Sequence, residues 1–260
     1  MVNKRLPKIE VNGAQLYYEL NGDGDPVVLV HGMSSDHEEW KYQVPELSKF
    51  FKVITCDLRG HGESSKEESN KFTVELFADD LDGLLKQLGF SKVHLVGHSL
   101  GGEVACCFAV KHPQMLKTLV LMGEPASSPP GFAFLPLMLK IFSLERIAKM
   151  SAPRLLHSAT EEKIQMLVKS NKRAGKATVS ADAKLVRSFR LPQELSSLSV
   201  PTLLVYGETD MMKKDVEAVQ KAVPNSRLVF IPKAGHLMQI DNPDEFNKAL
   251  LEFLLSHKQR

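Results

Sequence analysis

The sequence predicts an α/β fold with a mostly parallel central sheet, flanked by helices and interrupted by an inserted helical cap. Short apolar runs alternate with helical patterns in residues 1–123 and again in residues 194–260, which is typical of a parallel sheet. Residues 124–193 contain helical patterns and no convincing strand. We therefore expect one core domain, formed by residues 1–123 and 194–260, with a cap at residues 124–193.

The first half is expected to begin with a hairpin. Apolar and polar residues alternate on both sides of Asn12-Gly13, two residue types that tolerate the positive φ of a tight turn. Residues 27–30 are apolar at every position, as in a strand buried on both faces. The next predicted elements are a helix at 40–49, a strand at 52–56, a helix at 73–88, a strand at 93–96, a helix at 100–111 and a strand at 117–122.

The inserted segment opens with several helix-breaking residues, Pro125, Pro129, Pro130 and Gly131. Helical spacing of apolar residues then predicts three helices, at 135–150, 161–174 and 181–191. The strand and helix alternation resumes afterwards, with strands at 202–206 and 227–231 and helices at 212–222 and 244–257.

Composition excludes several classes of protein. The 33 Lys and Arg residues nearly balance 31 Asp and Glu residues, which leaves a net charge of +2 and argues against a nucleic-acid partner. Cys56, Cys106 and Cys107 cannot form a disulfide framework, and the first ten residues do not resemble a signal peptide. The longest apolar run, 132–142, is too short to span a membrane. We expect a cytoplasmic protein, as a monomer or homodimer, without metal or cofactor.

The segment Gly97-His98-Ser99-Leu100-Gly101 matches the pattern G-x-S-x-G. It lies between a predicted buried strand and a predicted helix, where a sharp turn lifts the serine hydroxyl clear of the sheet. The flanking glycines are needed because larger side chains would collide with the neighbouring strand and helix. This context predicts that Ser99 is a nucleophile.

A serine nucleophile needs a base and an acid that orients the base. His236 follows the last predicted strand, whereas His94 lies inside a strand and the turn directs His98 elsewhere, so His236 is the predicted base. Asp210 follows the strand 202–206 and is the predicted acid. Two other carboxylates, Glu208 and Glu124, remain alternatives for that role.

These motifs resemble those of the α/β-hydrolase fold superfamily, and the resemblance covers nearly the whole chain outside the inserted segment. The matching segments are His31-Gly32-Met33, Asp57-Leu58-Arg59-Gly60-His61-Gly62-Glu63-Ser64, Gly207-Glu208-Thr209-Asp210 and Ala234-Gly235-His236. The resemblance implies that the backbone N–H groups of Met33 and Leu100 form an oxyanion hole. Leu100 also opens a helix, where N–H groups lack partners.

The type of residue at position 99 restricts the class of reaction that the chain can catalyse. Haloalkane dehalogenases and epoxide hydrolases resemble this chain in fold but use Asp as the nucleophile, whereas this chain has Ser99. Cys106 and Cys107 are interpreted as core thiols. The residues predicted to line a substrate pocket are His31, Gly32, His98, Phe134, Leu137 and Met138.

The sequence thus predicts a serine hydrolase that cleaves a small, largely apolar ester or lactone through an acyl-enzyme on Ser99. A C–C bond hydrolase, a thioesterase or a perhydrolase remains an alternative on the same three residues, because a fold does not fix a function. A ligand receptor without enzymatic activity is a further alternative.

Overall fold

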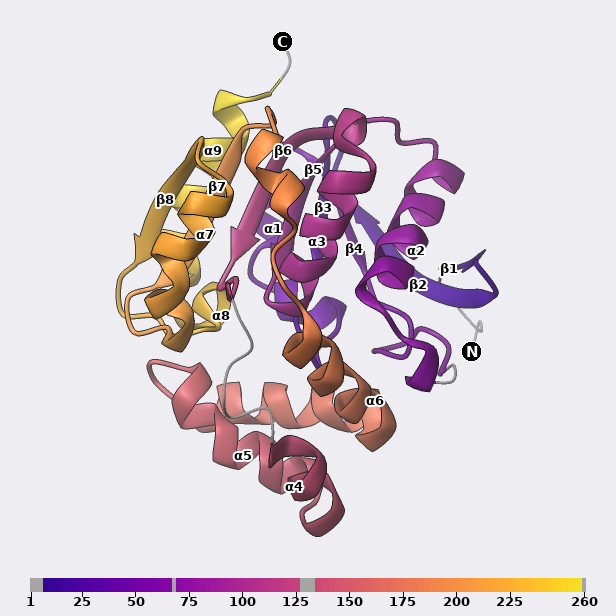
Figure 1. Ribbon diagram of the computed structural model, residues 1–260, viewed down its shortest axis with the longest axis vertical. Helices are drawn as coiled ribbons and strands as arrows, with labels where there is room; N and C mark the ends of the chain where they lie inside the picture. The colour runs from indigo at the N-terminus through magenta and orange to yellow at the C-terminus, as the bar shows by residue number, and fades with distance from the viewer. Residues whose placement is uncertain (1–6, 67–68, 127–133, 259–260) are drawn as a thin grey trace.

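The computed structural model describes residues 7–66, 69–126 and 134–258, which are built around an eight-stranded sheet (Figure 1). The strand order is β1-β2-β4-β3-β5-β6-β7-β8. β1 and β2 pair antiparallel, β2 pairs antiparallel with β4, and all other pairs are parallel. The prediction of a mostly parallel sheet is confirmed. The strands are β1 (Lys8–Val11), β2 (Ala14–Asn21), β3 (Pro26–Val30), β4 (Lys52–Cys56), β5 (Val93–His98), β6 (Leu116–Met122), β7 (Thr202–Gly207) and β8 (Ser226–Ile231).

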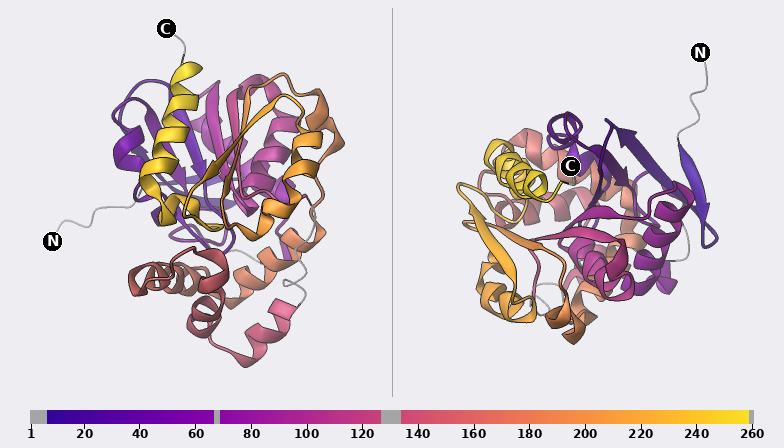
Figure 2. Two further views of the ribbon diagram at one scale, coloured as in Figure 1. Left: turned by 90° about the vertical axis from the view of Figure 1, so that its left-hand side faces the viewer. Right: turned by 90° about the horizontal axis from the view of Figure 1, so that it is seen from above.

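Helices cover both faces of this sheet, as Figure 2 shows from above. α2 (Val74–Gln87), α3 (Leu100–Lys111) and α7 (Val216–Ala222) pack on one face. α1 (Val44–Leu47), α8 (Met238–Asp241) and α9 (Pro243–Ser256) pack on the other. In β3, Val28 and Val30 face the first group while Val27 and Leu29 face the second, which explains why this strand is apolar at every position.

Two of the predicted helices are divided into a 3₁₀ turn and a shorter α-helix. The predicted helix 40–49 is a 3₁₀ turn at His37–Trp40 followed by α1. The predicted helix 212–222 is a 3₁₀ turn at Met211–Asp215 followed by α7. The first of these 3₁₀ turns starts where the Asp36 side chain accepts a hydrogen bond from the Glu38 N–H, and the second where Asp210 accepts one from the Met212 N–H. Each short turn is therefore started by its own capping carboxylate.

The described residues of the inserted segment form three α-helices, which begin and end at other places than predicted. The expected helix 135–150 is divided into α4 (Leu135–Ile141) and α5 (Leu144–Leu155), because the Ser143 side chain accepts from the Arg146 N–H and starts a new helix. The two helices expected after residue 160 are one long element, α6 (Glu161–Ser188), which is kinked where Gly175 has φ 84° and ψ 159°. Pro129, Pro130 and Gly131 lie outside the described residues.

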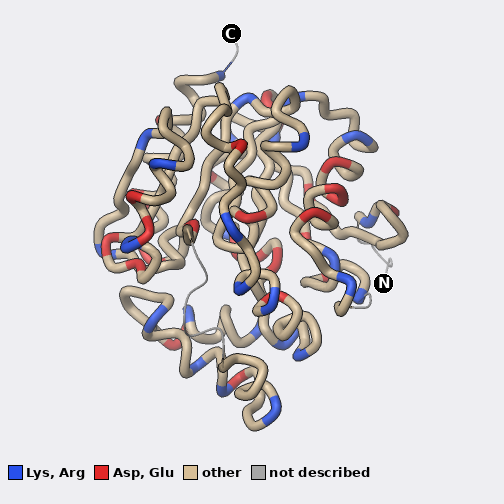
Figure 3. Tube along the Cα trace, viewed as in Figure 1, with Lys and Arg blue, Asp and Glu red and all other residues tan. Residues whose placement is uncertain are grey.

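Helices α4 to α6 lie beyond one end of the sheet, below it in Figure 1 and in the left view of Figure 2. Basic and acidic residues are interspersed along the chain, as the near-neutral composition suggests (Figure 3). A membrane-crossing helix, long and apolar enough to span a bilayer, is not found among the described residues. Cys56, Cys106 and Cys107 are free thiols.

Candidate active site

Ser99 occupies a sharp turn between β5 and α3, with φ 51° and ψ −115°. The turn leaves no room for side chains on its neighbours. A Cβ atom at Gly97 would lie 2.2 Å from the carbonyl oxygen of Gly101, and one at Gly101 would lie 2.3 Å from the carbonyl oxygen of Val30. The strained backbone and the two glycines are what a nucleophile elbow requires.

His236 and Asp210 form a buried hydrogen-bonded pair. His236 lies in the loop between β8 and α8, and its Nδ1 is 3.0 Å from Asp210 Oδ1. Asp210 follows β7, and the same oxygen accepts a hydrogen bond of 2.9 Å from the Met212 N–H. Asp210 is therefore fixed by two hydrogen bonds, one to His236 and one to the backbone. It orients the imidazole so that Nε2 is available to a further group.

The two partners shift each other's pKa in opposite directions. Burial lowers the pKa of His236, but the charge of Asp210 and its hydrogen bond outweigh burial, so the pKa of His236 lies above its ordinary value. Burial raises the pKa of Asp210, but the charge of His236 and the hydrogen bonds that Asp210 accepts hold the pKa below its ordinary value. The pair thus favours an imidazolium beside a carboxylate.

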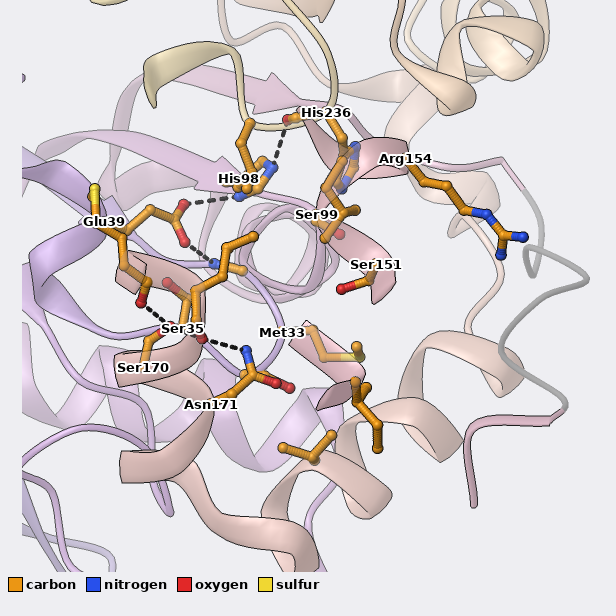
Figure 4. A pocket seen from close by; sticks show the side chains of 18 of the residues that line it. Met33, Ser35, Glu39, His98, Ser99, Ser151, Arg154, Ser170, Asn171 and His236 are labelled. Atoms are coloured by element: carbon orange, nitrogen blue, oxygen red, sulfur yellow. Dashed lines mark hydrogen bonds and ion pairs between the residues drawn. The ribbon is translucent and has the colours of Figure 1, made fainter. Parts of the chain in front are cut away.

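Ser99 and His236 line the same cavity, which has a volume of about 420 Å³ and is within the range of small-molecule sites. Figure 4 shows both side chains at one end of this cavity, with Ser151 and Arg154 of α5 across from Ser99. Ser99, Asp210 and His236 come from three loops that follow β5, β7 and β8. Because these strands are parallel, their carboxyl ends meet at one edge of the sheet.

The other two candidate acids lie elsewhere. Glu208 is exposed, and its Oε2 accepts a hydrogen bond from the Lys233 N–H. Glu124 is fully buried against the first turn of α3, where a Cβ atom on Gly102 would lie 2.1 Å from Glu124 Oε2. Burial, together with the charge of nearby Glu103, raises the pKa of Glu124 well above its ordinary value. Of the three candidates, Asp210 is the one whose hydrogen bond to His236 is observed.

The loop after β3 contains Met33, whose N–H is predicted to donate to an oxyanion. On either side of Met33, the Gly32 N–H donates to Glu39 Oε2 at 3.1 Å and the Ser34 N–H donates to Asp182 Oδ2 at 3.0 Å. Within the part of the chain that the structure describes, nothing accepts a hydrogen bond from the Met33 N–H. Leu100, the other predicted donor, is the first residue of α3, so its N–H has no partner within the helix.

Residues 25–143 match a family described as the alpha/beta hydrolase fold. A solved structure of a thermophilic esterase from Thermogutta terrifontis is 32% identical, with a TM-score of 0.85 and 98% of each chain covered. The chain belongs to the α/β-hydrolase fold superfamily. Epoxide hydrolase 3 of Xenopus tropicalis is 29% identical over 95% of this chain and 76% of that protein. An enol-lactonase from Burkholderia xenovorans LB400 shares the fold, with 24% identity, a TM-score of 0.88, and 96% of this chain and 100% of that chain covered.

The family match and the epoxide hydrolase relative support an enzyme with hydrolase activity. The similar proteins carry the names of epoxide hydrolase, esterase and enol-lactonase, so the superfamily hosts more than one reaction. Among the described residues of this chain there is no group of three or more His, Cys, Asp or Glu side chains arranged to hold a metal ion.

Two of the residues predicted to line the pocket belong to the loop after β3. Gly32 lines the cavity, but His31 lies behind the loop, fully buried. His31 Nε2 accepts from the Leu58 N–H at 3.0 Å, so Nδ1 carries the proton and donates to the Gly32 carbonyl oxygen at 2.8 Å. Burial lowers the pKa of His31 to about 4, which agrees with a neutral ring. In this α/β hydrolase, His31 therefore holds the loop after β3 against Leu58 and does not face the cavity.

The apolar residues of α4 divide between the cavity and the surface. Met138 lies in the cavity wall. Phe134 and Leu137 are not among its described lining residues, and they are 67% and 57% exposed. Leu139 is buried on the side of α4 that packs against other helices of the inserted segment. Helical periodicity identifies α4 as amphipathic, but it does not predict which face of the helix lines the cavity.

His98 lines the cavity with little exposed surface and is held by two acceptors. Its Nδ1 is 2.8 Å from Glu39 Oε1, and its Nε2 is 3.0 Å from the carbonyl oxygen of His236. Both ring nitrogens of His98 are therefore engaged by Glu39 and by the backbone of His236. Cavity-lining residues that the sequence did not predict are contributed by α5, α6 and the region after β8: Ile147, Met150, Met166, Leu167, Leu237 and Ile240.

Proposed function

We propose that this α/β hydrolase is a cofactor-independent serine hydrolase that cleaves a carboxylic ester or lactone through an acyl-enzyme on Ser99. The observation that carries this proposal is the convergence of three loops on one cavity, with Ser99 and His236 in its wall and Asp210 bonded to His236 at 3.0 Å. A serine, an imidazole and a carboxylate in this relation are the components of acyl transfer.

In the proposed reaction, Ser99 Oγ attacks the carbonyl carbon while His236 Nε2 accepts the hydroxyl proton. The C–O bond to the leaving alcohol then breaks, and His236 returns the proton to that oxygen. Water attacks the acyl-enzyme by the same route and releases the acid. Asp210 stabilises the imidazolium in both steps, and the pKa shifts of the pair favour that charged state.

The N–H groups of Met33 and Leu100 are the proposed donors to the oxyanion of each tetrahedral intermediate. They lie in the loop after β3 and at the start of α3, and β3 pairs directly with β5, the strand that leads into Ser99. A missing oxyanion donor typically costs about 10² to 10³ in kcat. Each donor is therefore expected to contribute substantially to the rate, although less than Ser99 or Asp210.

We further propose that residues 124–193 act as a cap over the core formed by residues 1–123 and 194–260. α4, α5 and α6 supply apolar side chains to the cavity, including Met138, Ile147 and Leu167. An apolar cavity of about 420 Å³ favours a small substrate with a largely apolar acyl or alcohol part.

A substrate panel tests the proposed reaction against the alternatives. Purified protein is assayed with p-nitrophenyl esters of increasing chain length, lactones, a thioester, an epoxide and a vinylogous C–C substrate. We expect the highest kcat/KM on an ester or lactone. A higher kcat/KM on the thioester or the C–C substrate would show that the ester or lactone reaction is wrong. Absence of turnover on every compound would favour a ligand receptor.

Activity should depend on pH through His236. The base must be neutral to accept a proton, and its pKa is raised by Asp210. As pH falls, kcat/KM should therefore decline with a midpoint above about pH 6.5, the ordinary pKa of histidine. The measurement is kcat/KM on an ester from pH 5 to 9, in wild type and in Asp210→Asn. The residual activity of the variant should show a lower midpoint; an unchanged midpoint would show that Asp210 does not set the pKa of the base.

A further inference from the structure

Two fully or nearly fully buried carboxylates hold the loop that contains Met33. Glu39 accepts from the Gly32 N–H at 3.1 Å, and Asp182 accepts from the Ser34 N–H at 3.0 Å. Their exposed fractions are 3% and 0%. Burying a carboxylate is costly unless its oxygens are satisfied, so two buried carboxylates that bind the amides on either side of Met33 suggest a role in shaping this loop.

Each of the two carboxylates is paired with a buried histidine. Glu39 Oε1 lies 2.8 Å from His98 Nδ1, and Asp182 Oδ2 lies 2.9 Å from His61 Nε2. Burial raises the pKa of Glu39, but His98 and other donors hold that pKa down to about 2. Burial lowers the pKa of His61, and Asp182 reverses the shift and raises it. Each of the two carboxylates beside the loop therefore faces a buried imidazole at hydrogen-bond distance.

The Glu39 side of this arrangement also reaches the loop of the proposed base. The second ring nitrogen of His98 is 3.0 Å from the carbonyl oxygen of His236, and Gln239 donates to Glu39 Oε1 at 2.9 Å. Figure 4 shows the connection from Glu39 through His98 to His236. One buried carboxylate thus joins the backbone of the Met33 loop to the backbone of the proposed general base.

The Asp182 side connects the same loop to the inserted segment. Asp182 belongs to α6, which also contributes Ser170, Asn171 and Val179 to the cavity wall. Before the kink at Gly175, Arg173 of α6 forms ion pairs of 2.6 Å with Asp36 and 2.8 Å with Glu38. α6 therefore contacts the region after Met33 twice. Arg173 binds it before the kink of α6, and Asp182 binds it after the kink.

The amides before and after Met33 each donate to a buried carboxylate, whereas the Met33 N–H has no acceptor among the described residues and is left to bind an incoming oxygen. Ser34 adopts φ 59°, a left-handed conformation that serine rarely takes and that surrounding contacts must maintain. We propose that Glu39 and Asp182 are positioning residues that hold this loop in the shape needed to stabilise the tetrahedral intermediate. The proposal rests on the proposed serine hydrolase function.

The test uses two isosteric variants, Glu39→Gln and Asp182→Asn, which keep the size of each side chain but remove its charge. On the best ester of the panel, we expect kcat to fall by about 10-fold to 100-fold, less than complete loss of an oxyanion donor, with KM changed by less than about 3-fold. The affinity for a trifluoromethyl ketone, which forms a tetrahedral adduct on the serine, should fall by the same factor as kcat/KM.

Thr118→Val is the matched control. Thr118 is buried and its Oγ1 lies 2.8 Å from His94 Nδ1, toward the amino end of the parallel strands and away from the cavity. This variant also removes a buried contact to an imidazole without changing size. It should lower the melting temperature while leaving kcat and the affinity for the trifluoromethyl ketone unchanged.

The outcomes separate this inference from the proposed function. If both carboxylate variants keep kcat within about 3-fold of wild type, or lose kcat without losing affinity for the ketone, the positioning role is wrong. If Glu39→Gln does not fold, Gln239→Leu takes its place because it removes a donor to Glu39, and unchanged kcat in that variant counts against the proposal. Continued labelling of Ser99→Ala by a fluorophosphonate would instead overturn the serine hydrolase itself.

Discussion

Ser99→Ala is expected to abolish covalent labelling by a fluorophosphonate probe and to lower kcat/KM on esters by about 10⁴-fold or more. The physical reason is that the attacking oxygen is removed, while the cavity and the oxyanion donors remain. Ser99 projects from a strained turn whose neighbours, Gly97 and Gly101, leave no space for other side chains. The measurements are gel fluorescence of the labelled protein and steady-state kinetics on the best substrate.

Cys107→Ser provides the control for labelling at a thiol. Cys107 lies on α3 beyond Ser99, and burial raises its pKa to about 11. Burial also raises the pKa of Cys106 well above its ordinary value. Neither thiol is therefore a thiolate at neutral pH, and Cys107→Ser should be labelled like wild type. Equal labelling of wild type and Ser99→Ala would show that Ser99 is not the nucleophile.

Asp210→Asn is expected to lower kcat by about 10⁴-fold, because the asparagine amide can no longer hold the imidazole in the required tautomer or stabilise its charged form. Asp210 Oδ1 bonds both His236 Nδ1 and the Met212 N–H. The isosteric change should leave the fold intact, which circular dichroism and the melting temperature can verify. The activity loss is measured as kcat on the best ester at the pH optimum.

Glu124→Gln is the matched comparison for the acid. Glu124 is buried beside Glu103, and its raised pKa favours the neutral carboxylic acid, which an amide mimics in size and charge. We expect kcat to change by less than about 10-fold in this variant. Full turnover by Asp210→Asn combined with loss of turnover in Glu124→Gln would assign the role of the acid to Glu124 instead.

The sequence predicted those parts of the molecule that depend on local patterns. The turn at Asn12-Gly13 has φ values of 48° and 77°, and Thr73 caps α2 by accepting from the Leu76 N–H. The apolar runs became parallel strands in the expected positions. Such features follow from backbone preferences and from the periodicity of burial, both of which are written in adjacent residues.

Local patterns were less informative in the inserted segment. The predicted helix 135–150 ends early because the side chain of Ser143 starts a second helix, and the helices expected before and after Gly175 are joined. Phe134, Leu137 and Met138 have similar apolar character, yet Met138 alone of the three is among the described residues lining the cavity. An amphipathic pattern gives the width of an apolar face but not the surface that the face meets.

For the candidate site, the sequence by itself determined that Ser99, Asp210 and His236 follow strands of one parallel sheet, and parallel strands bring such residues to a common edge. Only the tertiary structure decided which carboxylate reaches His236 and which ones hold the loop of Met33. Asp182 bonds the amide of Ser34 across 148 residues of sequence, and Glu39 meets His98 across 59. These contacts depend on how α6 and the loop after β3 pack together, and no spacing within a single element encodes that packing.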